Sequence, residues 1–274
     1  MRVPVLISTA LASSLFGAVA CELPGTGGEF VETGWRVEGL DASRPIVVAG
    51  VDGWQVELLE ARLLIGPIYL FAPPVTERGA LAELFAPGRA LAHAGDDNTV
   101  GGRVVTELLD QYAYDLLDPE PQLLPPTVAE AGPVDIANVV LDEARFGLAV
   151  ADGPTRGGHA FLRGVARREV DGVSQVVRFS AVLGPETVRD DRIARRVEAL
   201  PVVGELETGA TVVVQADPRL WVRQMRFDDW AGGATRETDE EIVIDAPSRL
   251  HNAWYLGLRD PAGWSLRVEA AESP

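Results

Sequence analysis

The segment from Gly157 to Gly184 constrains the fold more than any other part of the sequence. It contains two runs of residues that favour strands, and Asp171-Gly172 separates them. An Asp-Gly pair readily adopts the positive φ angles of a two-residue type I′ turn, which joins adjacent antiparallel strands. From Val173 to Ala181, apolar side chains alternate with mostly polar ones, so one strand face is largely apolar. The sequence therefore predicts a long β-hairpin with one buried face.

Further strand patterns occur along most of the chain. Thr211 to Gln215 is a run typical of a fully buried strand. Trp54 to Phe71 is too long for one strand, and its alternation changes near Leu58-Leu59, which indicates a bulge or a bend. Gly66-Pro67 is expected to interrupt the same segment again. Three other segments begin with Gly-Trp and continue as half-buried strands; they start at Gly34, Gly53 and Gly263.

Helical patterns are few and short. Thr76 to Phe85 has apolar residues on one side. Ser248 is a suitable N-cap for a helix that ends at Leu258, with a buried stripe that includes Leu250 and Trp254. We expect a mainly β fold, an antiparallel β-sandwich or partly closed barrel, with two or three short peripheral helices.

Prolines are dense between Asp118 and Pro133, where five of them occur in sixteen residues. Proline lacks the N–H group that a strand needs for its ladder, so it is confined to strand edges and bulges. We expect this segment to form a long surface loop. It contains no pattern that marks a domain boundary.

Residues 1–20 have the pattern of an export signal. Arg2 supplies a positive charge, Val3 to Ala20 is uncharged and mostly apolar, and small residues precede Cys21. Cys21 is the only cysteine in the sequence, so the chain has no internal disulfide. This arrangement resembles the bacterial lipobox, in which the cysteine is diacylated and becomes the first mature residue, although Ala18 stands where leucine is usual. The resemblance implies a lipoprotein anchored in a membrane through Cys21.

Other interpretations of the N-terminus stay open. Ala18-Val19-Ala20 also fits the site of ordinary signal peptidase, which would release a soluble protein, and the run could stay uncleaved as an anchor. Residues 21–29 are rich in glycine and are expected to form a flexible tether, followed by a single β-rich domain over 30–274. In enterobacterial lipoproteins, Asp directly after the lipidated cysteine retains the protein in the inner membrane. Residue 22 is Glu and not Asp, so this resemblance favours the outer membrane. The chain is also similar to uncharacterised envelope lipoproteins of GC-rich, myxobacterium-like species, for which no activity is implied.

Charge and motif content exclude several classes of function. The chain has 41 acidic and 24 basic residues and a net charge of -17, which argues against binding of nucleic acid through its phosphates. The sequence contains no Gly-x-Ser-x-Gly elbow, no phosphate-binding loop and no His-Glu-x-x-His motif. Hydrolysis of an envelope polymer by two facing carboxylates is the least favoured function, because so acidic a chain offers such pairs without any pattern.

Three histidines are candidates for metal ligation, namely His93, His159 and His251. His93 precedes Asp96 in a short polar segment that offers imidazole and carboxylate ligands, although the same residues also suit a turn. This segment, the Trp54 strand and the region of His251 resemble the layout of secreted copper-binding β-sandwich proteins of the methanobactin-associated type. The resemblance implies copper bound by His93 and His251, with Trp54 nearby.

Two functional hypotheses follow from these patterns. The first is a non-enzymatic, membrane-tethered lipoprotein of the cell envelope, a binding or structural module for an envelope protein or a glycan. The acidic composition suits a soluble domain that is repelled by phosphate-rich surfaces. The alternative is an envelope protein that binds copper through His93, Asp96 and His251.

Overall fold

The computed structural model describes residues 28–40, 45–73, 103–141, 154–184, 196–230, 240–246 and 248–271. The predicted features that lie outside these ranges are residues 1–27 with Cys21, the helix from Thr76 to Phe85, His93 and Asp96. Within the described ranges the protein is mainly β, with two short α-helices. The predicted fold class is therefore confirmed.

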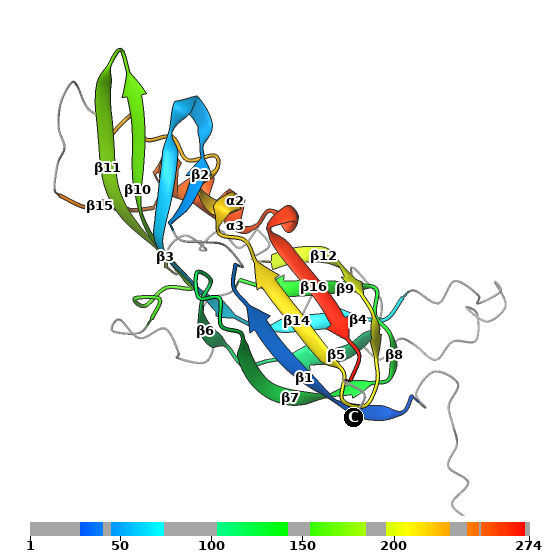
Figure 1. Cartoon of the computed structure of the whole chain (residues 1–274). Coiled ribbons are helices and arrows are strands. Elements are labelled where there is room, and N and C mark those ends of the chain that lie inside the picture. Colours follow the sequence, from blue (N-terminus) through cyan, green and yellow to red (C-terminus); the bar gives the residue numbers. More distant parts are fainter. Residues whose placement is uncertain are drawn as a thin grey trace, which may run out of the picture.

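A six-stranded sheet occupies one end of the elongated molecule (Figure 1). Its strand order is β15-β11-β10-β3-β2, and β6 pairs with the end of β3. The predicted hairpin forms its centre: β10 and β11 pair without a register shift, and Asp171 and Gly172 have φ angles of 53° and 75°. The strands are β2 (Ile46–Ala49), β3 (Gln55–Ile65), β6 (Tyr112–Asp115), β10 (Ala160–Val170), β11 (Val173–Leu183) and β15 (Ile242–Ile244).

An eight-stranded sheet curls into a nearly closed barrel at the other end. Its order is β5-β4-β9-β12-β16-β14-β1-β7, with parallel pairing of β1 with β14 and of β12 with β16. The run from Thr211 to Gln215 lies inside β14, a central strand, as predicted. The strands are β1 (Phe30–Glu38), β4 (Ile68–Phe71), β5 (Val104–Leu108), β7 (Gln122–Glu130), β9 (Ile136–Val140), β12 (Arg196–Val203), β14 (Thr211–Ala216) and β16 (Trp264–Glu269), beside a small pair of β8 (Gly132–Pro133) and β13 (Glu205–Leu206).

Side chains close the barrel between its two end strands, β5 and β7. The Thr106 hydroxyl lies 3.0 Å from the Thr127 hydroxyl and donates to the Val128 carbonyl over 3.1 Å. At the end of the seam, Arg103 forms an ion pair of 2.5 Å with Glu130. The described part of β5 is thus joined to β7 by polar side chains in place of a backbone ladder.

The segment from Trp54 to Phe71 passes from one sheet into the other. The register between β3 and β10 shifts at Leu59, which has no partner on β10, so the predicted bulge is confirmed. Gly66-Pro67, a cis peptide bond, separates β3 from β4 as predicted. A Cβ at Gly66 would lie 2.2 Å from the Asp110 carbonyl oxygen, so only glycine fits at this crossing.

The proline-rich segment is a strand, and the predicted surface loop is wrong there. Residues 122–130 form β7, which pairs with β1 alone and so is an end strand of the sheet. Pro125 and Pro126 lie at the register shift between the pairs Trp35–Leu124 and Thr33–Thr127. Because an end strand and a bulge both leave N–H groups without ladder partners, proline is tolerated at these two positions.

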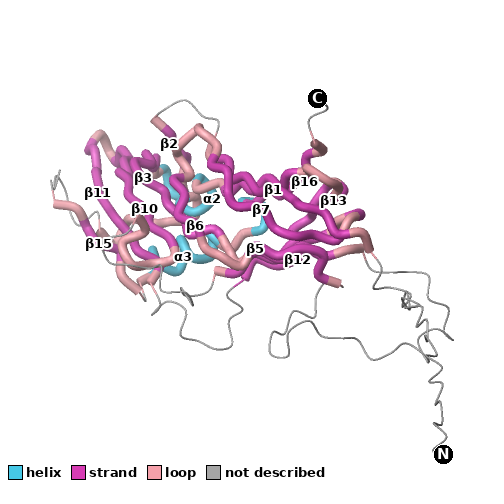
Figure 2. Tube along the Cα trace, turned by 90° about the horizontal axis from the view of Figure 1, so that it is seen from below, coloured by secondary structure: helices cyan, strands magenta, loops and turns pink. Residues whose placement is uncertain are grey.

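Two helices lie next to the six-stranded sheet in both views (Figures 1 and 2). The longer helix, α3 (Arg249–Leu258), begins at Ser248, whose hydroxyl accepts from the His251 N–H, and it buries Leu250, Trp254 and Leu258 as predicted. The shorter, α2 (Arg219–Val222), packs against α3 at Gly257. A Cβ at Gly257 would lie 2.5 Å from the Leu220 carbonyl oxygen, so glycine permits this close packing.

Candidate functional site

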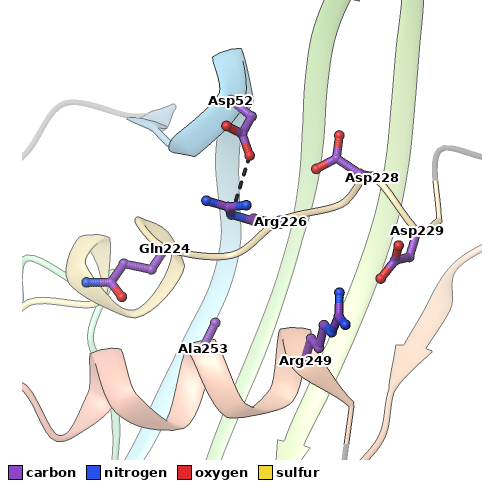
Figure 3. Close-up of a pocket in the computed structure, with 7 residues that line it drawn as sticks. All are labelled: Asp52, Gln224, Arg226, Asp228, Asp229, Arg249 and Ala253. Atoms are coloured by element: carbon purple, nitrogen blue, oxygen red, sulfur yellow. Dashed lines mark ion pairs between the residues drawn. The ribbon is translucent and has the colours of Figure 1, made fainter.

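A charged groove beside α3 is the candidate site (Figure 3). Its volume is about 510 Å³, which is within the usual range for small-ligand sites. Three segments far apart in the sequence form its walls: the turn before β3, the chain that follows α2, and the first turns of α3. The described lining residues are Asp52, Gln224, Arg226, Asp228, Asp229, Arg249 and Ala253.

The chain after α2 presents its charges to the groove because alternate residues are buried. Met225 and Phe227 are buried, whereas Arg226 and Asp228 are exposed. The Phe227 ring packs 5.4 Å from the Trp54 ring and 5.0 Å from the Phe179 ring, measured between centroids. This aromatic contact fixes the backbone on which Arg226 and Asp228 stand.

Asp52 reaches the groove from the turn between β2 and β3. Asp52 and Gly53 both have positive φ angles, 56° and 78°, within the 3₁₀ turn η1 (Val51–Gly53). The Asp52 carboxylate lies 3.4 Å from the Arg226 guanidinium, as the dashed line in Figure 3 shows. Both side chains are more than 40% exposed, so this ion pair orients the two groups but stabilises the fold little.

Arg168, which is not itself a lining residue, holds Asp228 in place through an ion pair. Its guanidinium carbon lies 4.5 Å from the centroid of the Trp54 ring, and its Nε donates to Gln175 over 2.8 Å. Its Nη1 forms an ion pair of 2.5 Å with Asp228. The Arg168 side chain is only 14% exposed, so Asp228 is held by a rigid, largely buried cation.

Arg249 and Asp229 are the two charged lining residues without an ion pair among the described residues. Both are exposed, and neither makes an ion pair or a side-chain hydrogen bond with another residue that the structure describes. Figure 3 shows the Arg249 side chain extending from α3 toward the segment that carries Asp228 and Asp229. The groove thus offers one guanidinium and one carboxylate with no partner in the described part of the chain.

His251 faces the interior and not the groove, although Arg249 and Ala253 flank it on α3. Its side chain is 1% exposed and packs edge-on against Trp254, with ring centroids 5.6 Å apart. Burial lowers the pKa of His251, while a hydrogen bond to the Val182 backbone and the charge of Asp245 act in the opposite direction. Burial therefore favours the neutral form of this ring, which belongs to the core.

The copper hypothesis stays a prediction. Its other ligands, His93 and Asp96, lie outside the described residues, and His159 is a second buried histidine. The described ranges contain no group of three or more histidine, cysteine or acidic side chains that could hold a metal ion. The lipidation of Cys21 also stays a prediction, because Cys21 lies outside the described residues.

The sequence analysis missed the groove residues, but a signal for some of them exists. Asp52-Gly53 is the same dipeptide as Asp171-Gly172 and marks the same kind of turn. Arg226, Phe227 and Asp228 alternate between charged and apolar, as a half-buried extended segment does. Nothing local in the sequence indicates that these two segments meet beside α3.

The chain matches no known family model, no curated protein and no solved structure. None of the described helices has the length and apolar character needed to cross a membrane. The function is therefore inferred from the groove and from the pattern of the N-terminus.

Proposed function

We propose that this protein is a non-enzymatic lipoprotein of the cell envelope, tethered through Cys21, that binds a partner in the groove beside α3. The position of the groove carries this proposal. The elements that line it lie in the half of the molecule with the six-stranded sheet, whereas β1, which the proposed tether would join, starts at the far end of the barrel (Figure 1). Such a placement separates the groove from the point of attachment, so the tether would leave it accessible to a partner.

The course of β1 sets this separation. The strand begins at Phe30 and runs for nine residues along the barrel, which corresponds to roughly 30 Å. Beyond its end, the Leu40 N–H donates to the Leu116 carbonyl, next to β6 and the last residues of β3. The groove lies farther along, at the turn that precedes β3. The groove is therefore well separated from the start of β1, where the proposed tether joins the fold.

The chemistry of the groove supports binding. Its described walls carry carboxylates, guanidinium groups and one amide, which are groups that recognise charged and polar ligands. Two of the three carboxylates are already held in ion pairs by Arg226 and Arg168. Fixed, paired charges favour orientation of a ligand, which fits a binding module.

Lipid attachment is tested by metabolic labelling of the full chain with an alkyne fatty acid, followed by membrane fractionation. We expect labelled protein in the membrane fraction and loss of the label in Cys21→Ala. Because Cys21 is the only cysteine in the sequence, no second thiol can accept the acyl group in that variant. Release of an unlabelled protein that begins at Cys21 would refute the anchor, and retention of the intact N-terminus would do the same.

A further inference from the structure

We infer that the groove binds a dipolar ligand, one that carries a free carboxylate and a free ammonium group, as a short unblocked peptide does. This inference rests on the proposed binding function and names the class of ligand for the same site. It follows from the charges that remain without a partner after the ion pairs of the groove have been assigned.

Arg249 forms the subsite for the carboxylate. It is the first residue of α3, a helix of ten residues, so its guanidinium stands beside the positive end of the helix dipole. A guanidinium donates two parallel hydrogen bonds to a carboxylate, and this geometry suits the free C-terminus of a peptide. The described residues supply no carboxylate within ion-pair distance of Arg249, so this donor is available to a ligand.

Asp229 forms the subsite for the ammonium group. Asp52 is engaged by Arg226, and Asp228 is engaged by Arg168. Asp229 is the remaining carboxylate of the described lining, and it is exposed. Figure 3 places it on the wall that faces Arg249, so the two free charges of opposite sign border the same space.

The balance of charge in the groove argues against a polyanion or a polycation. With Arg168 included, three carboxylates meet three guanidinium groups, whereas the whole chain has a net charge of -17. A polyanion would be repelled by the protein and a polycation would find no excess of acid in the groove. Gln224 offers an amide that both donates and accepts, which suits a peptide bond.

The test is calorimetric titration of the full-length protein in detergent with the dipeptide alanyl-alanine. The same dipeptide is then titrated with an acetylated N-terminus, with an amidated C-terminus and with both ends blocked. We expect the free dipeptide to bind and each block to weaken binding by about tenfold, the loss of one charged contact. Equal affinities for the free and the doubly blocked dipeptide, or no heat from any of the four, would overturn the inference.

Two variants assign the ends of the ligand. Arg249→Gln should abolish the difference between the acid and the amide, and Asp229→Asn should abolish the difference between the amine and its acetylated form. Arg223→Gln is the matched control, because Arg223 is exposed and neighbours the groove without lining it. Variants that weaken all four ligands equally would contradict the assignment, and near-ultraviolet circular dichroism establishes that each variant is folded.

Free peptides and the peptide chains of a cell-wall polymer share this chemistry. Sedimentation of the protein with purified cell-wall sacculi, with and without excess alanyl-alanine, distinguishes the two sources. The outcome is independent of lipid attachment, since it is read on purified protein. A labelled, membrane-bound protein that does not prefer the free dipeptide would therefore refute the ligand class and leave the anchor standing.

Discussion

The barrel and the groove end of the molecule differ in how they satisfy their buried indole N–H groups. In the barrel, the buried Trp35 indole donates to the Thr127 hydroxyl over 2.8 Å, and Thr127 in turn contacts Thr106 at the seam. At the groove end, the buried indole N–H groups of Trp54 and Trp254 have no acceptor among the described residues. An unpaired buried donor costs free energy, so these two indoles are less favourably placed than that of Trp35.

A group of half-buried charges on the barrel is fully paired. On the outer face of the barrel, β1, β14 and β16 carry a closed network in which every charge has at least one partner of opposite sign. In the groove, Arg249 and Asp229 have no partners in the described chain, as is also true of the exposed carboxylates Glu198 and Glu205 at the barrel end. The members of the barrel network are Arg36, Glu38, Gln215, Arg267 and Glu269.

The largest effect is expected where α2 meets α3. In Gly257→Ala the new Cβ would lie 2.5 Å from the Leu220 carbonyl oxygen and 2.8 Å from the Trp221 Cα, so the helices must separate. We expect the free energy of unfolding to fall by about 2 to 3 kcal/mol, measured by chemical denaturation. Gly184→Ala is the control, because a Cβ there meets nothing within 4 Å. Equal stability of the two variants would show that the helix packing is looser than described.

The indole N–H groups give the next largest difference. Trp35→Phe and Trp54→Phe both remove ring volume from a fully buried position, but only Trp35 also loses a hydrogen bond in the described chain. We expect Trp35→Phe to be the more destabilising by about 1 kcal/mol, the usual net contribution of one such bond. Denaturation midpoints of the two variants measured in parallel test this, and the reverse order would remove the contrast between the regions.

The barrel network should make stability depend on pH through Glu38. Burial raises the pKa of Glu38, but hydrogen bonds and charge interactions with Arg267 and Arg36 outweigh it and leave the pKa below its usual value. The network is therefore fully stabilising above the unfolded-state pKa, and its contribution is lost as the pH falls through the lower folded-state pKa. We expect a loss of at most about 1 kcal/mol in acid, as for other partly exposed ion pairs.

Glu38→Gln provides the comparison for this pH dependence. The variant keeps the shape of the side chain but has no proton to bind in this range, so the acid loss assigned to Glu38 should vanish. Thermal unfolding of both proteins across the acid range measures the difference in slope. Parallel curves for wild type and variant would show that Glu38 does not couple folding to protons.

Local patterns predicted the strands well because each depended on neighbouring residues alone. The Asp171-Gly172 hairpin, the bulge at Leu59 and the cap at Ser248 are all set by steric and hydrogen-bonding preferences within a few residues. The proline-rich strand β7 was missed because its prolines are tolerated only at an end strand with a bulge, and the position of a strand in a sheet is not a local property.

The groove could not be predicted for a related reason. The groove is formed by three segments, which carry Asp52, Asp228 and Arg249, and well over a hundred residues separate the first from the second. Only the packing of Phe227 on Trp54 and of α3 on α2 brings these segments together. His251 shows the converse. Its residue type suggested a ligand, but the helix phase set by Leu250 and Trp254 turns it into the core.

The smallest effect on stability is expected at the two free charges of the groove. Arg249→Gln and Asp229→Asn remove groups that are exposed and have no partner in the described chain. We therefore expect the free energy of unfolding to change by no more than about 0.5 kcal/mol, with a correspondingly small shift of the melting temperature. Arg168→Gln is the matched contrast, because Arg168 is largely buried on Trp54 and bonds both Gln175 and Asp228. It should clearly lower the melting temperature. If Arg249→Gln were as destabilising as Arg168→Gln, Arg249 would be serving the fold, and its assignment as a ligand subsite would fail.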